Sequence, residues 1–371
     1  MPTQSITPIA ILTYCLTLMV TCILAYGGLV DQPWSYDDLE HIESARRSLQ
    51  DWSEIAAPTA KEPTRWVLNL YFRCAYWAFG DEPGRYHTAN IVLHLVNSLL
   101  CANLLLQLFH RPLLAGLAGF LFALNCAPYE AIYEISAAGL LIGTAFSIQS
   151  VSLAHRGMET GSRRTILSGA GCFGLALFSY ESLVSVILPI AYLWWSRKRR
   201  ESLFLPISYL TMVAGFLLID SLYYGTVTGK IGFNAIELGV HAGYNLLFFV
   251  GRLFLNAYFT PFGWDSPAPF DVPVEAFDTY AFIGFLLIGF LIYRSLYSRI
   301  FKFSTIWIIP ALLPYLFGTM DFYFPRYWYL ASVGSSLLYS NALLWLYQIV
   351  GRKAIAQILV AASLLILGWW S

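Results

Sequence analysis

The sequence predicts an all-α, polytopic membrane protein of about 11 transmembrane helices, because its composition and the lengths of its apolar segments both require lipid. Of the 371 residues, 58% are hydrophobic and 12% are charged, whereas a soluble domain has about 25% charged residues. The mean hydropathy is +0.60. One hydrophobic core cannot hide this much apolar surface, so residues 1–371 are expected to form a single transmembrane domain.

The expected spans are apolar segments, most of which reach the roughly 17–25 residues that a spanning helix needs. They lie at residues 7–30, 88–109, 112–128, 131–154, 164–179, 181–196, 203–223, 278–296, 304–320, 326–349 and 353–370. The first is interpreted as a retained anchor, since it lacks a basic region before it and is long for a secretory signal. The polar residues of segment 241–260 predict a re-entrant or interfacial helix, because a full crossing would turn the later basic loops outward.

Short basic loops set the expected orientation, since Lys and Arg favour cytoplasmic loops. They occur at Arg111 and within residues 156–164, 197–200, 294–302 and 352–353. The N-terminus is then cytoplasmic, and residues 31–87 and 224–277 form the first and second extracytoplasmic segments. On this topology most acidic residues lie outside, which argues against nucleic acid or a soluble anionic substrate as partner.

The first outer segment is expected to contain amphipathic helices. Leu39, Ile42, Leu49 and Trp52 keep roughly helical spacing, which predicts a helix lying on the membrane surface. A second helix is expected over residues 65–80, with Trp and Tyr side chains that suit the membrane interface.

Two adjacent acidic residues, Asp37 and Asp38, follow Tyr36 at the start of the first of these helices. Ser35 and Asp38 have the spacing of a capping box. Two aspartates in a first helical turn also favour the helix dipole without any further role. The sequence leaves both interpretations open, structural and catalytic.

The span that begins near residue 88 carries a polar face. His87, Asn90, His94 and Asn97 follow helical spacing and therefore share one side. We expect Asn90 and Asn97 to form interhelical hydrogen bonds, as such residues commonly do. For His87, at the outer mouth of the span, a structural and a functional role are equally expected.

Ionisable residues from several separate segments are expected at the same outer face. They are Asp37, Asp38, Arg65, His87, Glu130, Glu134, Glu181 and Arg326, with Tyr36, Tyr180 and Tyr327 beside them. Ionisable groups near the membrane plane usually serve function, although Arg326 also suits snorkelling within an aromatic belt. Convergence from so many segments is what favours a functional site.

No cofactor or metal is assigned from the sequence. The six cysteines form no CxxC pair and no metal-ligand spacing, and no disulfide framework is indicated. Glu130, Glu134 and Glu181 have the hard oxygen ligands that divalent ions prefer, so dependence on a divalent metal is left open.

Several different short motifs occur one after another along the chain. The residues are Tyr36-Asp37-Asp38, Arg65, Tyr71, Phe79-Gly80, Tyr86-His87, Asn90, Leu93-His94, Asn97, Phe122-Ala123-Leu124, Glu130-Ala131, Ser179-Tyr180-Glu181, Pro189, Arg326-Tyr327, Tyr329-Leu330 and Ser332-Val333-Gly334. In this order they resemble the membrane region of the O-mannosyltransferase-like proteins of the GT-C glycosyltransferase superfamily. The eukaryotic members of that group carry tetratricopeptide tails, and bacterial relatives exist. The resemblance covers roughly residues 31–340.

The resemblance implies an inverting glycosyltransferase of GT-C fold that takes a sugar from a polyprenyl-phosphate donor at the extracytoplasmic face. It implies Asp37 or Asp38, with Asp37 favoured, as the general base for the acceptor hydroxyl, and Arg326 and Arg65 as the groups that hold the donor phosphate. Membrane lipid and an acceptor of open identity are the other implied partners. A bacterial inner membrane is favoured over the endoplasmic reticulum.

Two departures from the family pattern keep other functions in view. Residues 137–140 read Ala-Ala-Gly-Leu where the family often has Gly-Arg-x-Asp, and Tyr180 stands where a lysine is frequent. A catalytically inactive relative that serves as a membrane subunit or lipid-binding scaffold is therefore the alternative. A transporter is less favoured, because Asp220 is the only acidic residue well inside an expected span.

Overall fold

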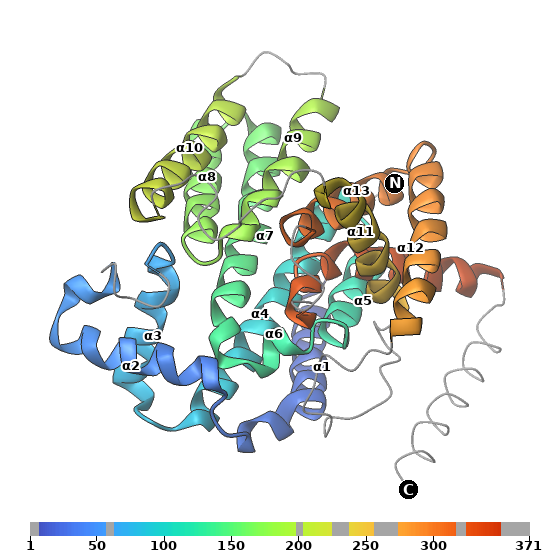
Figure 1. Ribbon diagram of the computed structural model, residues 1–371. Coiled ribbons are helices and arrows are strands. Elements are labelled where there is room, and N and C mark those ends of the chain that lie inside the picture. Colours follow the sequence, from blue (N-terminus) through green and yellow to red (C-terminus); the bar gives the residue numbers. More distant parts are fainter. Residues whose placement is uncertain are drawn as a thin grey trace, which may run out of the picture.

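The computed structural model describes residues 7–56, 63–197, 203–224, 237–255, 274–316 and 324–349, and the structural statements below refer to these residues. All regular secondary structure within them is helical (Figure 1), which confirms the predicted all-α class. The last expected span, 353–370, lies outside the described residues, as do parts of the expected outer segment 224–277.

The helices follow one another with short connections. The elements are α1 Pro8–Tyr26, η1 Gly27–Asp31, α2 Tyr36–Gln50, η2 Trp52–Ile55, α3 Trp66–Phe79, α4 Pro83–Phe109, α5 Pro112–Ala123, α6 Glu130–Tyr133, η3 Ile135–Ala137, α7 Ala138–Thr160, α8 Arg163–Leu177, η4 Glu181–Val186, α9 Ile187–Ser196, α10 Phe204–Tyr224, α11 Glu237–Leu255, α12 Val274–Ser295, α13 Arg299–Leu312, η5 Leu313–Tyr315 and η7 Pro325–Trp328, and residues 332–349 are also helical.

Five helical segments in the described part of the chain are long and apolar enough to cross a membrane. They are Pro8–Asp31, Pro83–Phe109, Ile135–Thr160, Phe204–Tyr223 and Asp278–Ser295. Each coincides with a segment that the sequence predicts as a span. The helices Pro112–Ala123 and Glu181–Ser196 are apolar but shorter.

Several of these helices present apolar side chains outward. Leu24 of α1 is 81% exposed and Leu222 of α10 is 76% exposed. Soluble monomers rarely expose contiguous apolar faces of this kind, so lipid is the environment that such faces suit.

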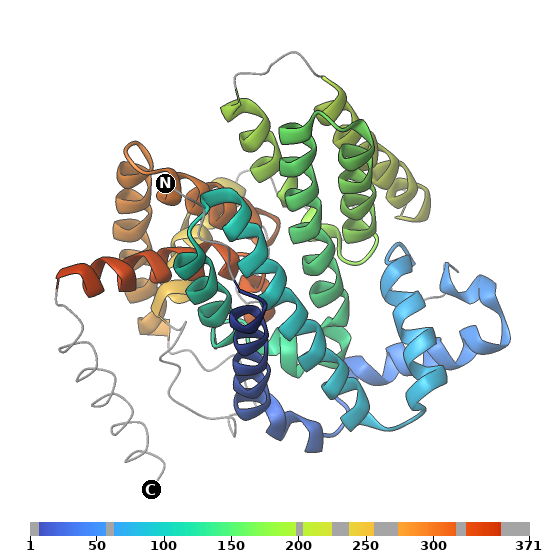
Figure 2. The ribbon, with the colours of Figure 1, turned by 180° about the vertical axis from the view of Figure 1, so that it is seen from behind.

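The centre of the molecule is built on α4 and α7, which pack against each other. On one side α7 packs against α8, and α8 against α10; on the other, α4 packs against α5, and α11, α12 and α13 form a further group (Figures 1 and 2). The helices α2 and α3 pack against each other and project at the end where α4 begins. Tyr26 joins α1 to this centre, since its hydroxyl donates to the Ala123 carbonyl at 2.9 Å.

Basic residues predicted for cytoplasmic loops share one end of the helices. Arg197 donates to Glu159 at 2.9 Å, which joins the ends of α9 and α7. Arg299 at the start of α13 lies over the ring of Phe109 at the end of α4. The opposite ends of α4 and α7 meet α6 and η3, and α2 packs against η3. The end that carries Arg197 and Arg299 is called the basic end below, and the other is called the α2 end.

The predicted apolar face of α2 is wrong in one respect. Ile42 is 5% exposed and packs into a cluster with Leu68 and Phe72 of α3. Leu39 and Trp52, by contrast, are 51% and 63% exposed. Ile42 lies on the face of α2 that α3 covers, so these side chains do not form a single surface stripe.

Candidate functional site

Asp38 fastens the start of α2 to the segment before α7. One of its carboxylate oxygens accepts the backbone N–H of Ser35 at 2.9 Å, and the other accepts that of Ser136 at 2.7 Å. The residue is 1% exposed. Burial raises the pKa of Asp38, and these N–H donors oppose the shift. The predicted capping box is confirmed, and Asp38 has a structural role in the α2 end.

Asp37 precedes Asp38 on the same turn but is exposed. Successive helical residues point about 100° apart, so the two carboxylates face different surroundings. Asp37 faces the charges of the site: it adds to the effect of burial in raising the pKa of Glu130. Tyr36 begins α2, and its side chain lies outside the described part of the structure.

Arg326 and Glu130 join η7 to α6. One carboxylate oxygen of Glu130 accepts the backbone N–H of Arg326 at 3.1 Å, and the other lies 3.7 Å from Nη1 of Arg326. The guanidinium carbon lies 4.4 Å from the centroid of the Phe324 ring. Among the described residues, Nε of Arg326 is buried and has no hydrogen-bond partner. A buried donor left unpaired is costly, so this guanidinium is suited to an anionic ligand.

The surroundings of Arg326 keep it charged. Burial alone would lower the pKa of the Arg326 guanidinium, but the neighbouring Glu130, Tyr180 and Tyr327 outweigh that effect and the pKa is raised. The side chain is 15% exposed. A charged guanidinium that is largely shielded from water can bind phosphate strongly through charge-assisted hydrogen bonds.

Arg65 is engaged within the protein. Its Nε and Nη2 donate to the two oxygens of Glu181 at 2.7 and 2.6 Å, which is a bidentate pair. The guanidinium also lies over the ring of Tyr180, 4.3 Å from its centroid. Tyr180, which stands where the resembled family often has lysine, thus lies directly beneath a cation that α3 supplies.

Tyr327 extends this aromatic and cationic group. Its ring stacks on Tyr315 with centroids 4.0 Å apart, and the hydroxyl of Tyr315 lies 2.5 Å from that of Ser182. Burial raises the pKa of Tyr327 and Tyr180 raises it further, whereas Arg326 lowers it. Residues from η4, η5 and η7 are therefore held side by side at the α2 end.

Glu134, at the end of α6, is a carboxyl group whose pKa is strongly raised. Ser35 donates its hydroxyl to Glu134 at 2.6 Å, and the backbone carbonyl of Glu134 accepts from Asn90 at 2.9 Å. Burial raises the pKa of Glu134 to about 7, with Asp38 and Glu130 adding to the shift. A carboxyl group whose pKa is raised this far is typical of functional sites.

His87 lies behind these groups at the start of α4. It is 1% exposed, and its ring centroid lies 6.3 Å from that of Tyr133. Neither ring nitrogen forms a well-aligned hydrogen bond among the described residues, but backbone groups of Gln32, Pro33 and Tyr133 lie next to the ring. The structural and functional roles that the sequence leaves open for His87 therefore both stay open.

The remaining polar residues of α4 bind neighbouring helices, as predicted. Asn90 donates to the Ile132 carbonyl at 3.3 Å as well as to that of Glu134. Asn97 donates to the Leu141 carbonyl at 2.9 Å and to the Tyr329 hydroxyl at 3.0 Å. Interhelical hydrogen bonding is thus confirmed for Asn90 and Asn97.

Arg252 of α11 is a further cation near this group that the sequence analysis does not place in the site. Its guanidinium lies 4.9 Å from the centroid of the Trp328 ring, and its charge acts on Glu130. Trp328 in turn donates to the Phe249 carbonyl at 2.8 Å, which ties η7 to α11. Arg252 lies within an otherwise apolar segment, and this position was the sequence feature that could have indicated a functional role.

The structure thus gathers residues of α2, α3, α6, η4, η7 and α11 at the α2 end. Asp37, Glu130, Glu134, Arg326 and Tyr327 form one electrostatic group. Asp38 and His87 lie beside it in the protein interior. No group of three or more His, Cys, Asp or Glu side chains placed to hold a metal ion occurs within the described residues.

Comparison with protein-family models, with curated proteins and with solved structures gave no match. The class that the fold itself defines is an all-helical protein with helices of membrane-spanning length and a charged site at one end of them.

Proposed function

We propose that this protein is a membrane glycosyltransferase that moves a sugar from a polyprenyl-phosphate donor to an acceptor hydroxyl. The observation that carries the proposal is Arg326, whose buried guanidinium has an unused Nε donor among the described residues and a carboxylate group nearby. A phosphate leaving group needs such a donor, because charge develops on its oxygen as the sugar departs.

Asp37 is the proposed general base. It accepts the proton of the acceptor hydroxyl while the acceptor oxygen attacks the anomeric carbon of the sugar. The bond from that carbon to the phosphate oxygen breaks, and the electron pair leaves with the polyprenyl phosphate, whose charge Arg326 stabilises. Asp38 is a poorer base, because its carboxylate oxygens already accept the N–H groups of Ser35 and Ser136.

Arg65 is proposed to act through its neighbours. Its pair with Glu181 and its position over Tyr180 hold the ring that lies beside Arg326 and Tyr327. Arg326 is then the main phosphate-binding residue. Arg65 positions Tyr180, which lies beside the proposed donor site.

The proposal includes the finer features of the membrane arrangement. These are about 11 crossings in a GT-C-like order, a cytoplasmic N-terminus, and an α2 end that faces the extracytoplasmic side. A bacterial inner membrane is the proposed location. The acceptor, whether protein, lipid or glycan, reaches the site from outside.

Binding of undecaprenyl phosphate to the purified protein in lipid nanodiscs tests the phosphate site without knowledge of the sugar. We expect Arg326→Ala to weaken binding by about 1.5–3 kcal/mol, the value for hydrogen bonds to charged groups. Arg326→Lys should restore part of it, because an ammonium lacks the guanidinium fork. Arg85→Ala is the matched control, since Arg85 is exposed on the first turns of α4. Equal affinity in all variants would contradict the proposal.

Transfer from a panel of undecaprenyl-phosphate hexoses tests catalysis. Asp37→Asn should reduce transfer by about 10²–10⁴-fold, the usual contribution of a general base, while lipid phosphate binding stays unchanged. Full transfer by Asp37→Asn would remove Asp37 from the mechanism.

A lipid-binding scaffold without catalysis is the second candidate. It is favoured by the number of charges at the α2 end that already pair within the protein, Arg65 with Glu181 and Arg326 with Glu130. For this candidate we expect undecaprenyl phosphate to bind and no hexose to be released from any donor, with Asp37→Asn indistinguishable from wild type in both assays.

A further inference from the structure

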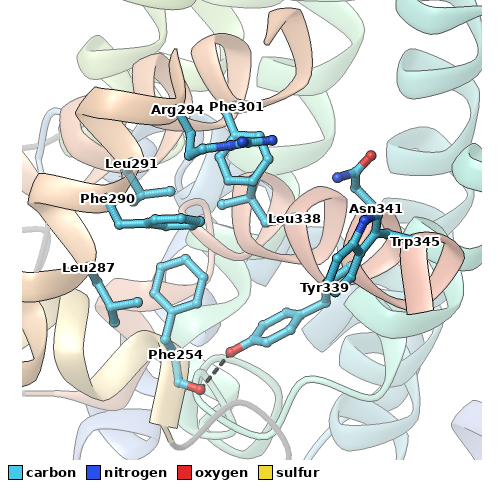
Figure 3. Close-up of a pocket in the computed structure, with 11 residues that line it drawn as sticks. Phe254, Leu287, Phe290, Leu291, Arg294, Phe301, Leu338, Tyr339, Asn341 and Trp345 are labelled. Atoms are coloured by element: carbon cyan, nitrogen blue, oxygen red, sulfur yellow. Dashed lines mark hydrogen bonds between the residues drawn. The ribbon is translucent and has the colours of Figure 1, made fainter. Parts of the chain in front are cut away.

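A cavity of about 460 Å³ lies between α12, the start of α13 and the helix of residues 332–349. This is within the roughly 300–1,000 Å³ of small-molecule sites. Leu287, Phe290, Leu291 and Arg294 line it from one face of α12, at the spacing of consecutive helical turns. Leu338, Tyr339, Asn341, Ala342 and Trp345 line it from the opposite helix (Figure 3).

The cavity is polar at one end and apolar along the rest. Arg294 and Asn341 lie toward one end in Figure 3, and Phe254 and Tyr339 lie toward the other. The hydroxyl of Tyr339 donates to the Phe254 carbonyl at 2.5 Å, so it is not free to bind a polar ligand as a donor. From Leu287 to Arg294, α12 rises by about 10 Å. The cavity is therefore elongated along the helix, with its charge at one terminus.

Arg294 lies at the polar end without an acidic partner among the described residues. Its guanidinium lies over Phe301, 5.2 Å from the ring centroid, which holds it beside the cavity. Arg294 is the basic residue that lines the cavity. A guanidinium without a carboxylate partner among the described residues attracts an anion such as a lipid headgroup.

We propose that this cavity binds one acyl chain of an anionic membrane phospholipid, with the lipid phosphate on Arg294. The apolar wall takes the chain, and the charge at the mouth selects the headgroup. The site lies at the basic end, and is therefore separate from the donor site proposed near Arg326. It requires that α12, one of the five helices of spanning length, lies in the bilayer.

Competition between two lipids that share the same chains tests the headgroup. Delipidated protein in detergent is given palmitoyl-oleoyl phosphatidylglycerol and palmitoyl-oleoyl phosphatidylcholine in equal amounts, and bound lipid is counted by native mass spectrometry. We expect phosphatidylglycerol to be retained about fivefold over phosphatidylcholine, as for one basic residue near a lipid headgroup. Arg294→Gln should abolish that preference. Arg164→Gln, an exposed arginine on α8, is the matched control and should keep it.

Filling the cavity with a large side chain tests whether the cavity binds the acyl chain of the lipid. Ala342→Trp places a large side chain between the two helices while leaving Arg294 in place, and it should reduce retention of both lipids. Circular dichroism and size-exclusion chromatography confirm that the variant is folded. Leu287→Trp fills the cavity from α12 and serves in its place if Ala342→Trp fails to fold.

Several results would overturn the proposal. One is equal retention of the two lipids by wild type, and another is an unchanged preference in Arg294→Gln. If glycerol 3-phosphate alone competes as well as the intact lipid, the site binds free anions and the chain has no part. If a second copy of the protein covers the cavity, native mass spectra will show a dimer that Ala342→Trp dissociates and lipid does not affect.

Discussion

Residues at the α2 end differ in how many of their polar atoms already form hydrogen bonds within the protein. Asp38 has both carboxylate oxygens engaged, and Arg65 has two donors on Glu181. Arg326 keeps an unused buried donor among the described residues, and Asp37 is exposed. A ligand gains most from a buried donor that has no partner, because that donor gains a hydrogen bond without breaking another. Of these residues, Arg326 is therefore the one most suited to bind an anionic ligand.

Substitution of Asp37 and Asp38, one at a time, tests which of them stabilises the fold. Asp38→Asn replaces one acceptor with an amide donor that faces a backbone N–H, so we expect a loss of about 1–3 kcal/mol in the free energy of unfolding. Asp37→Asn should change it by less than about 0.5 kcal/mol, as at other surface positions. Chemical denaturation in detergent, followed by tryptophan fluorescence, measures both. Equal stability of the two variants would contradict the structural role of Asp38.

Glu134 predicts a dependence of stability on pH. Its ordinary pKa is 4.5 and burial raises it to about 7, so the folded state binds the proton more tightly than the unfolded state does. Stability is then greatest below about pH 4.5 for this group and falls as pH rises toward 7. Burial raises the pKa of Asp38 too, which acts in the same direction.

Glu134→Gln should flatten this slope, since glutamine stays neutral and its carbonyl still accepts the Ser35 hydroxyl. The melting temperature measured at half-unit steps from pH 5 to pH 7.5 shows the effect. A wild-type slope that persists in Glu134→Gln would assign the pH dependence to other groups.

Pairs of elements at the α2 end are held together by close backbone contact. A Cβ on Gly139 of α7 would lie 2.7 Å from the Ser179 carbonyl oxygen and 3.2 Å from the Leu68 side chain. Val67 donates its backbone N–H to the Phe178 carbonyl at 3.0 Å, and Trp66 stacks on Phe178. These contacts set the position of Arg65 next to Glu181. Gly139 thus lies against the segment that carries Tyr180.

Gly139→Ala should lower the free energy of unfolding by about 1–3 kcal/mol, because the added methyl group meets a backbone oxygen that cannot move independently. Gly171→Ala is the control. Gly171 is also within a helix, α8, and a Cβ there meets nothing within 4 Å. Alanine at this position should stabilise by up to about 1 kcal/mol through helix propensity. A similar change in both variants would show that the approach of α7 to Ser179 is not tight.

Within the described residues, basic side chains and the candidate site lie at opposite ends of the helices. Arg197 and Arg299 lie at one end, and the candidate site lies where α4 and α7 begin. A membrane potential and anionic lipids both favour basic residues on the cytoplasmic side. The orientation with the basic end in the cytoplasm stays a prediction.

Labelling by a membrane-impermeant maleimide on intact spheroplasts tests that orientation. Cys74 of α3 is exposed at the α2 end and should be labelled. A cysteine introduced by Arg164→Cys, at the basic end, should be labelled only after the membrane is permeabilised. Cys74→Ser provides the background, since the other cysteines are buried or half-buried. Labelling of Arg164→Cys but not of Cys74 in intact spheroplasts would invert the topology.

The sequence by itself determined the helical membrane class, the segments of spanning length and the capping box at Ser35, because each depends on residues that are close in the chain. It also placed polar residues on one face of α4 through helical spacing. Only the tertiary structure decided that Asp38 binds Ser136, 98 residues away, that Arg65 binds Glu181, 116 residues away, and that Ile42 is covered by α3. The physical reason is that a side chain's unused hydrogen-bonding capacity depends on which distant backbone or side-chain group packs against it, and local pattern carries no information about that partner.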